Sequence, residues 1–213
     1  MSLRLPEPGR PKALREPATL EQRRTLIGAP HMKPLLGLVR DLRDRYGFVP
    51  DFDPLDGGAR ARLLLLLETP GPRIFTSAFV SRDNPTGTAA NLFRFTREAG
   101  IPRREMLLWN TVPWVIHQKG ARNRAPSRTE ILEGLRELPA LIALLPRLRG
   151  VILAGRVAGM ARSTLADLRP DLPVVEIPHP SPTFVCTSPE VSRRIHDGLV
   201  RAKTWLSAAP GES

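Results

Sequence analysis

An imidazole and a hydroxyl group are held in a proline-rich turn close to the C-terminal end of the chain. His179 and Ser181 alternate with three prolines over residues 177–182, directly after a β-rich stretch at residues 173–177. Each proline fixes its own φ angle and favours an extended conformation for the residue before it, so the loop should be stiff. Rigid loops at the carboxyl ends of strands are where open α/β sheets bind ligands. The turn therefore predicts a functional site, with an incidental surface histidine as the alternative.

Two earlier apolar runs also end in polar residues. Glu68, Pro70 and Gly71 come after a run of five leucines, and Asn110 ends a second apolar run. If both runs are strands of a parallel sheet, their carboxyl ends share one edge with the loop of His179. A carboxylate, an amide, an imidazole and a hydroxyl would then face one crevice. The set lacks the Gly-rich loop with a lysine that cradles phosphate, and it lacks the elbow of a serine nucleophile.

The elements that must position these residues alternate along the chain. Strands are predicted at residues 63–67, 106–109, 151–154 and 174–177, where short apolar runs are flanked by Gly and Pro. Helices are predicted at residues 32–46, 88–99, 155–168 and 188–206, and from a capping box at residue 127 to a helix that Pro139 should kink or split. This alternation predicts an α/β protein, a three-layer α/β/α sandwich with a central four-stranded parallel sheet.

The charge of the chain indicates an anionic partner. The 213 residues carry a formal net charge of +11, and the basic residues are mostly arginine, which makes forked contacts to phosphate. Nucleic acid is the usual partner of such a surface, with a compositional bias towards arginine as the alternative. Cys186 is the only cysteine and the four histidines lack metal-ligand spacing, so neither a disulfide framework nor a metal or other cofactor is expected.

The domain organisation follows from composition. Residues 1–25 are rich in Pro, Arg and Glu and predict a flexible basic arm, residues 26–207 a single domain, and residues 208–213 a tail. No apolar stretch is long enough for a signal peptide or a membrane span, so a cytoplasmic protein without a membrane partner is expected.

In their order and spacing, these motifs resemble the uracil-DNA glycosylase superfamily. Leu-Glu-Thr-Pro-Gly at residues 67–71 is similar to the Gly-Glu-Ala-Pro-Gly motif of its iron–sulfur branches, and Asn ends the later strand at residues 108–110. His-Pro-Ser at residues 179–181 matches the C-terminal motif, and the turn at residues 154–156 resembles the glycine turn of the family. The resemblance spans roughly residues 32–206.

The chain also departs from that pattern. Leu67 stands in place of the first motif's glycine, and the cluster cysteines are absent, so the chain differs from an ordinary iron–sulfur member. The usual Pro-Phe pair is also missing, and Pro85 and Thr86 stand there instead. The residue that stacks on the base therefore stays open.

The resemblance implies excision of uracil from DNA, with a role for each rim residue. Asn110 would read the N3–H and O4 of uracil, and His179 would donate to O2 as negative charge develops there. Ser181 would bind a phosphate next to the flipped nucleotide. Glu68 would orient the attacking water, with Asp83 as its rival.

Further residues are assigned less directly by the same resemblance. Either Phe75 or Phe79 would stack on the base, although each could belong to the core instead. Thr183 or Phe184 would fill the gap that a flipped nucleotide leaves in the duplex. A basic loop would contact phosphate, or would simply be solvated, and it includes Lys119, Arg122 and Arg124.

The expected protein is a monomer that binds uracil-containing DNA and hydrolyses the glycosidic bond without a lyase step, since no lysine nucleophile lies on the rim. Three alternatives stay open. The first is a glycosylase for another deaminated base, such as hypoxanthine or xanthine. The second is a relative that binds DNA without excision, and the third is a small-molecule α/β enzyme, which would not bind DNA in a salt-dependent way.

Overall fold

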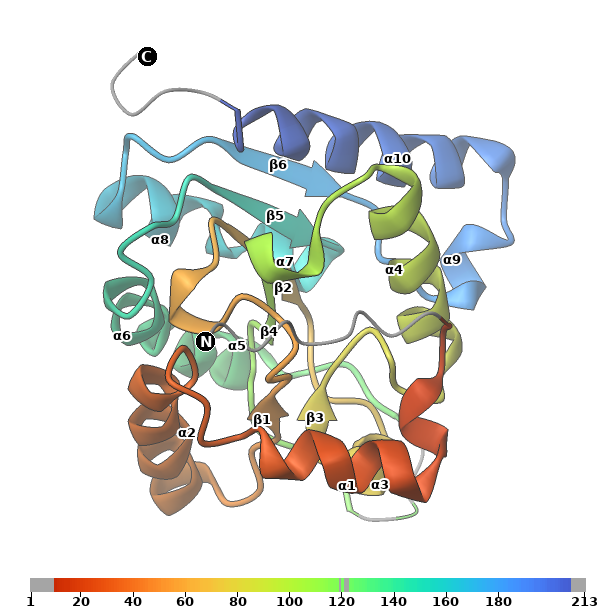
Figure 1. The fold of residues 1–213 in the computed structure, drawn as a ribbon. Helices are drawn as coiled ribbons and strands as arrows, with labels where there is room; N and C mark the ends of the chain where they lie inside the picture. Colours follow the sequence, from red (N-terminus) through yellow and green to blue (C-terminus); the bar gives the residue numbers. More distant parts are fainter. Residues whose placement is uncertain (1–9, 119, 121–122, 208–213) are drawn as a thin grey trace.

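A sheet of four parallel strands, in the order β4-β2-β5-β6, forms the centre of the protein (Figure 1). The computed structural model describes residues 10–118, 120 and 123–207. The strands are β2 (Leu63–Leu67), β4 (Met106–Asn110), β5 (Gly150–Ala154) and β6 (Val174–Ile177). The two inner strands are apolar without alternation because both faces of the sheet are covered. The predicted α/β class and its four-stranded parallel sheet are confirmed.

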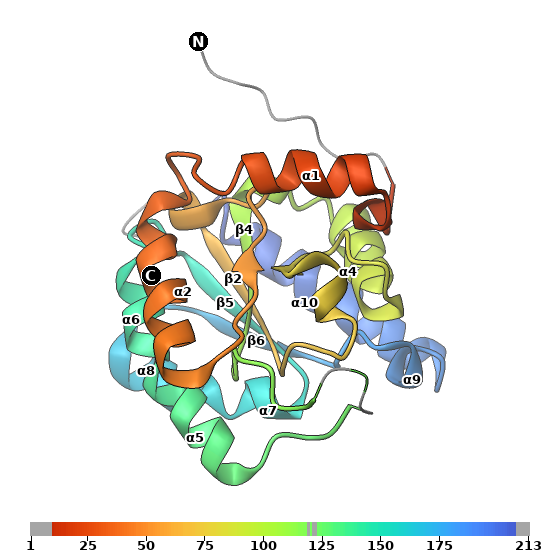
Figure 2. The same ribbon diagram turned by 90° about the horizontal axis from the view of Figure 1, so that it is seen from below.

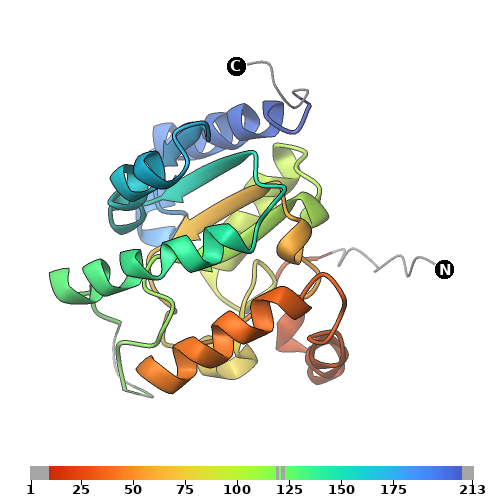
Figure 3. The ribbon, with the colours of Figure 1, turned by 90° about the vertical axis from the view of Figure 1, so that its left-hand side faces the viewer.

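Helices cover both faces of this sheet, which gives three layers (Figures 2 and 3). On one face lie α4 (Gly87–Glu98) and α10 (Pro189–Thr204), which pack against each other. On the other face lie α2 (Lys33–Tyr46), α5 (Arg128–Arg136), α6 (Leu138–Ala143) and α8 (Ala161–Leu168). Three helices of a single turn lie in connections: α3 (Ile74–Ser77), α7 (Arg156–Gly159) and α9 (Pro182–Val185).

Local sequence signals set several helix ends. The side chain of Thr86 accepts a hydrogen bond from the backbone of Ala89 and caps α4. Ser127 and Glu130 form a capping box at the start of α5. Pro139 lies in the first turn of α6, so the predicted split of this helix is confirmed.

A second, very small sheet was not predicted. β1 (Asp51–Phe52) pairs in parallel with β3 (Phe79–Val80) beside the main sheet. Each strand has only two residues, too few for an apolar period to show in the sequence. The pair joins the loop after α2 to the segment that follows α3.

The N-terminal segment packs on the domain, unlike the predicted flexible arm. Residues Ala13–Arg15 form a 3-10 helix and α1 (Pro17–Thr25) follows, with Leu14 only 1% exposed and Arg23 only 2% exposed. The prediction is therefore wrong for this segment, because the burial of Arg23 depends on carboxylates far away in the sequence. Residues 1–9 of the predicted arm and the predicted tail at 208–213 lie outside the described residues.

The described residues contain neither a candidate membrane span nor a candidate metal cluster. None of the helices in this part of the chain has the length and apolar character needed to cross a membrane. Nor does this part contain three or more His, Cys, Asp or Glu side chains grouped so that they could hold a metal ion.

Candidate active site

The carboxyl ends of β2 and β4 bring Glu68 and Asn110 onto neighbouring strands. Leu67 pairs with Asn110 in the ladder, and the pairing continues beyond the strands. The backbone N–H of Thr111 donates to Leu67 O at 2.9 Å, and that of Val112 donates to Glu68 O at 3.0 Å. The backbone of Glu68 is thus held by the strand that carries Asn110.

Gly155 allows Glu68 and His179 to approach one backbone position. It follows β5 with a φ of 95°, and its N–H donates to Ile177 O at 2.9 Å. A Cβ atom at this position would lie 2.8 Å from Glu68 Oε1 and 3.0 Å from the Cβ of His179. The Glu68 carboxylate also accepts from the backbone N–H of Val157 at 3.4 Å. A bare glycine therefore brings the carboxylate and the imidazole together.

The hydrogen bonds of His179 decide which of its nitrogens carries the proton. The backbone N–H of Ser181 donates to His179 Nδ1 at 3.2 Å, so the neutral ring carries its proton on Nε2. Burial lowers the pKa of His179, while the charge of Glu68 acts in the opposite direction. The ring is therefore neutral at pH 7 and offers Nε2–H as a donor.

Asn110 has 4% of its surface exposed, and its side-chain amide makes no hydrogen bond to the described residues. It lines a mostly apolar pocket between the sheet and helices α2, α5 and α6, together with Trp109 and several leucines. Glu68 and His179 lie outside the lining of this pocket. Among the described residues, the fully buried side-chain atoms without a partner belong to Asp56, Arg82 and Asp83, so the amide of Asn110 is accessible and available to a ligand.

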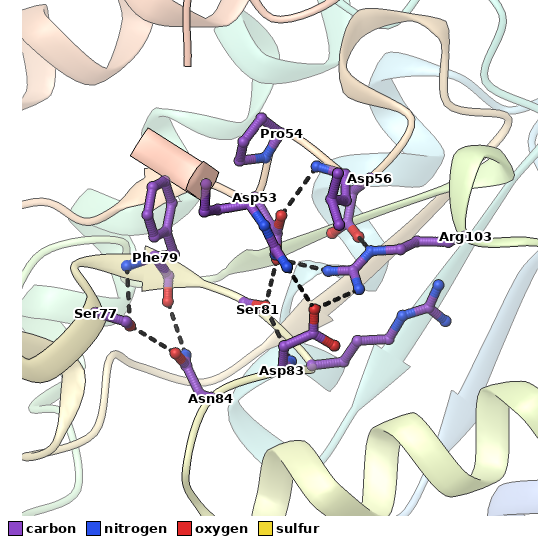
Figure 4. A network of polar contacts seen from close by, with 12 residues as sticks. Asp53, Pro54, Asp56, Ser77, Phe79, Ser81, Asp83, Asn84 and Arg103 are labelled. Carbon is purple, nitrogen blue, oxygen red and sulfur yellow. Dashed lines mark hydrogen bonds and ion pairs between the residues drawn. The ribbon is translucent and has the colours of Figure 1, made fainter. Parts of the chain in front are cut away.

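Asp83 belongs to a different part of the protein, shown in Figure 4. It is fully buried, and its Oδ2 accepts from Arg23 Nη2 at 2.9 Å and from Arg103 Nη1 at 2.6 Å. The structure contradicts the interpretation of Asp83 as a rival of Glu68 for the water, because two guanidinium groups bind Oδ2 and Oδ1 is buried away from the surface.

Asp83 is one member of a buried ion network, which we define as Arg23, Asp53, Asp56, Asp83 and Arg103. Arg103 contacts all three carboxylates at 2.5 to 2.9 Å, and Arg23 contacts Asp53 and Asp83. Burial raises the pKa of Asp56 to about 7 despite the opposing charge of Arg103. Burial also opposes ionisation of Asp53, but Arg103 and Arg23 outweigh it and hold the pKa of Asp53 below its ordinary value.

The two candidate stacking residues differ in exposure. Phe79 lies in β3 with 1% of its surface exposed, so it is a core residue, contrary to the stacking role considered for it. Phe75 is half-buried and contacts Phe48 with ring centroids 5.0 Å apart and His117, edge-on, at 6.3 Å. Phe75 therefore stays the candidate.

Phe48 and His117 also lie near the candidate site, although the sequence alone assigns neither of them to it. His117 Nε2 lies 3.3 Å from the carbonyl oxygen of Pro70, which places this ring against the first motif. The backbone N–H of Val115 donates to Phe48 O at 3.0 Å. No local pattern in the sequence marks either residue, because tertiary contacts alone bring both to Phe75. Of the first motif, Pro70 is buried, and a Cβ at Gly71 would meet nothing within 4 Å.

The residues after His179 form an exposed edge. The hydroxyl oxygens of Ser181 and Thr183 lie 3.3 Å apart, and Phe184 is 55% exposed with its ring edge-on to His179 at 6.5 Å. In the basic loop, Arg124 is exposed and paired with Glu130 at 2.5 Å. The predicted phosphate contacts Lys119 and Arg122 lie outside the described residues.

A comparison with known proteins identifies the family of the chain. A sequence model of a family, described as the uracil DNA glycosylase superfamily, matches residues 56–197. A search of curated proteins gave no match. The matched region contains Glu68, Asn110, Gly155 and His179, and the match supports a role as a DNA glycosylase. With two thirds of its length matched and a site assembled at the carboxyl edge of a parallel sheet, the chain belongs to the uracil DNA glycosylase superfamily.

Proposed function

We propose that this protein removes uracil from DNA by hydrolysing the N-glycosidic bond of a flipped-out nucleotide, leaving an abasic site. The observation that carries the proposal is the neutral imidazole of His179, which keeps an N–H donor available beside the carboxylate of Glu68. Cleavage of the bond leaves its electron pair on the base and positive charge on the sugar. A fixed donor and a fixed carboxylate are the groups that stabilise these two charges.

His179 and Glu68 divide this work. His179 Nε2–H donates to O2 of uracil, where the negative charge of the leaving base collects. A neutral donor keeps its proton, so it acts by a hydrogen bond that strengthens in the transition state. Glu68 orients the water whose oxygen bonds to C1′ of the sugar and accepts the proton that this water loses, and its charge favours the developing cation.

Asn110 supports the choice of uracil as substrate. A side-chain amide accepts from N3–H and donates to O4 of uracil at the same time. Cytosine presents the reversed pair of groups and would leave a buried amide mispaired, which discriminates strongly. Since Asn110 has no partner among the described residues, its amide is available for this pairing.

Binding of DNA is supported by charge and by one exposed ring. The net charge of +11 favours phosphate contacts without sequence preference. Phe184, exposed next to the catalytic turn, has the apolar character of a side chain that inserts where a base has left the stack. Ser181 contacts a phosphate that flanks the flipped nucleotide.

The test is excision on labelled oligonucleotides that contain a single uracil, with and without an opposing strand, resolved after alkali treatment. We expect cleavage at uracil, reduced about 100-fold or more by His179→Ala and strongly by Asn110→Ala. The matched control is His196→Ala, since His196 is a partly exposed residue of α10 whose ring nitrogen lies 3.5 Å from the exposed Asp197.

Parallel oligonucleotides that contain hypoxanthine or xanthine separate the alternatives. Cleavage at one of these bases but not at uracil would overturn the substrate assignment. Binding that weakens with salt, without cleavage of any of the three, would favour a relative that binds DNA without excision. If the protein neither cut nor bound these oligonucleotides, the proposal would fail as a whole.

A further inference from the structure

Helix α4, which is far from His179 in the sequence, holds the turn that carries His179. Pro178, Pro180 and Pro182 have no backbone N–H, so this turn has few donors with which to anchor itself. Its carbonyl oxygens remain available. The side-chain amide of Asn91 donates to Pro180 O at 2.9 Å, a contact between residues 89 positions apart in the sequence.

A second contact lies at the start of the same helix. A Cβ atom at Gly87 would lie 2.3 Å from Cγ of Pro182, so only glycine lets the helix approach this ring. Thr86 fixes the position of Gly87, because its side chain caps α4 through the backbone of Ala89. The helix therefore contacts the turn on both sides of Ser181.

Ser181 is the residue whose backbone N–H donates to His179 Nδ1. The peptide group between Pro180 and Ser181 carries both the carbonyl that Asn91 holds and the N–H that His179 accepts. Because a peptide group is planar, fixing the direction of its carbonyl also fixes the direction of its N–H. The hydrogen bond from Asn91 therefore fixes the orientation of the N–H group that donates to the imidazole, because one rigid peptide carries both groups.

We propose that Asn91 is a positioning residue, which holds the Pro180–Ser181 peptide so that the neutral His179 ring keeps its proton on Nε2. The catalytic consequence rests on the proposed function, whereas the effect on the ring is independent of it. Asn91 does not touch the reacting atoms. Without its amide, the peptide rotates more freely and both tautomers of the ring become populated.

The first test replaces the amide. In Asn91→Asp the shape is kept but the donor is replaced by a carboxylate that repels Pro180 O, and in Asn91→Ala the donor is removed. We expect the single-turnover excision rate to fall about tenfold in each variant, while affinity for abasic DNA stays within about threefold. The matched control is Glu98→Gln, the reverse exchange of acid and amide two turns further along α4, at an exposed residue.

The second test uses the close approach at Gly87. Gly87→Ala raises helix propensity, so it should not unfold α4, but the new methyl group displaces Pro182. We expect a rate reduced as in Asn91→Ala with a melting temperature that falls by only a few degrees, because the displaced Pro182 is exposed. Gly37→Ala in α2, where a Cβ would meet nothing within 4 Å, is the matched control and should leave the rate unchanged.

A readout without activity separates this proposal from the proposed function. The nitrogen shifts of the His179 ring, assigned by comparison with His179→Ala, report its tautomer by NMR in the full chain. We expect the Nε2–H form in the wild type and in Glu98→Gln, and a mixture of tautomers in Asn91→Ala and Asn91→Asp. If the wild type excises nothing but the tautomer shifts as expected, the proposed function fails and the positioning role stands.

Two results would overturn the positioning role. One is an unchanged tautomer in both Asn91 variants. The other is a loss of rate that matches the loss of folded protein in thermal melts, because a merely structural residue would behave in that way.

Discussion

Replacing Arg23 tests whether the N-terminal helix is an integral part of the domain. Arg23 comes from α1, which precedes the region matched by the family model, yet only 2% of its surface is exposed. Its guanidinium contacts Asp53 at 2.5 Å and Asp83 at 2.9 Å, and both carboxylates are fully buried. Arg23→Ala removes the cation and leaves these two anions in place.

The size of the effect follows from what remains of the buried ion network. Removal of one partner from a buried ion pair costs about 3–5 kcal/mol, because the other charge stays desolvated. Arg103 still contacts Asp53 at 2.5 Å and Asp83 at 2.6 Å, so each carboxylate keeps one guanidinium. We therefore expect the lower end of that range, about 3 kcal/mol. For a chain of this length each kcal/mol lowers the melting temperature by about 2–4 °C, so the total is about 6–12 °C.

The measurement is urea denaturation followed by circular dichroism, together with a thermal melt. The control is Arg24→Ala, the next residue of the same helix. Arg24 is exposed and lies 3.4 Å from the exposed Glu21, a kind of pair that contributes about 0.5 kcal/mol or less. Arginine and alanine have similar helix propensities, so the two substitutions differ mainly in burial.

A loss below about 1 kcal/mol in Arg23→Ala, or an equal loss in both variants, would refute this reasoning. The charges of Asp53 and Asp83 would then be satisfied without α1, and the segment before residue 26 would behave as the loosely attached arm that its composition predicts.

Two further predictions concern the site and the pH dependence of stability. Gly155→Ala places a methyl group 2.8 Å from Glu68 Oε1 at a φ of 95°, so excision in the oligonucleotide assay should fall about 100-fold or more; a rate within about threefold of wild type would contradict the close approach. For Asp56, burial raises the pKa to about 7, above its unfolded value, so the stability that its proton provides is lost as pH rises through 7. Asp56→Asn cannot ionise and should gain stability relative to the wild type between pH 5 and pH 8 in urea denaturation, whereas the exposed control Asp41→Asn should show no such gain.

The main sheet could be predicted from the sequence because its strands are short and mostly apolar, and its two inner strands are buried on both faces. These runs mark β2 and β6 to the residue, although β6 includes the exposed Glu176, and they mark β4 and β5 to within one residue. The pairing of β1 with β3 could not be predicted, since strands of two residues carry no period and Asp51 pairs with Phe79 across a long connection. Phe79 was considered for the stacking role for the same reason, because a strand of two residues cannot be recognised in the sequence.

The candidate site could be predicted in part. Asn110 ends a strand, and Glu68 and His179 lie just after the ends of two others. The parallel order of a sheet places such residues on one edge without any knowledge of side-chain contacts. The role of Asp83 could not be predicted, because the sequence around a carboxylate in a polar stretch is the same whether its side chain faces solvent or two arginines. Its environment is set by Arg23, which lies 60 positions earlier. Such contacts exist only in the folded chain.

The two sides of the site should differ in how easily they open. β2 is paired on both edges, four of its five leucines are at most 1% exposed, and its ladder continues through the carbonyls of Leu67 and Glu68. Amide hydrogens of such a central strand exchange with solvent only when most of the protein unfolds. α9 has a single turn and no buried residue, so it belongs to the class of segments that open locally. Glu68 is therefore fixed to the slowest-exchanging part of the protein, whereas Phe184 lies in a segment whose amide hydrogens should exchange faster.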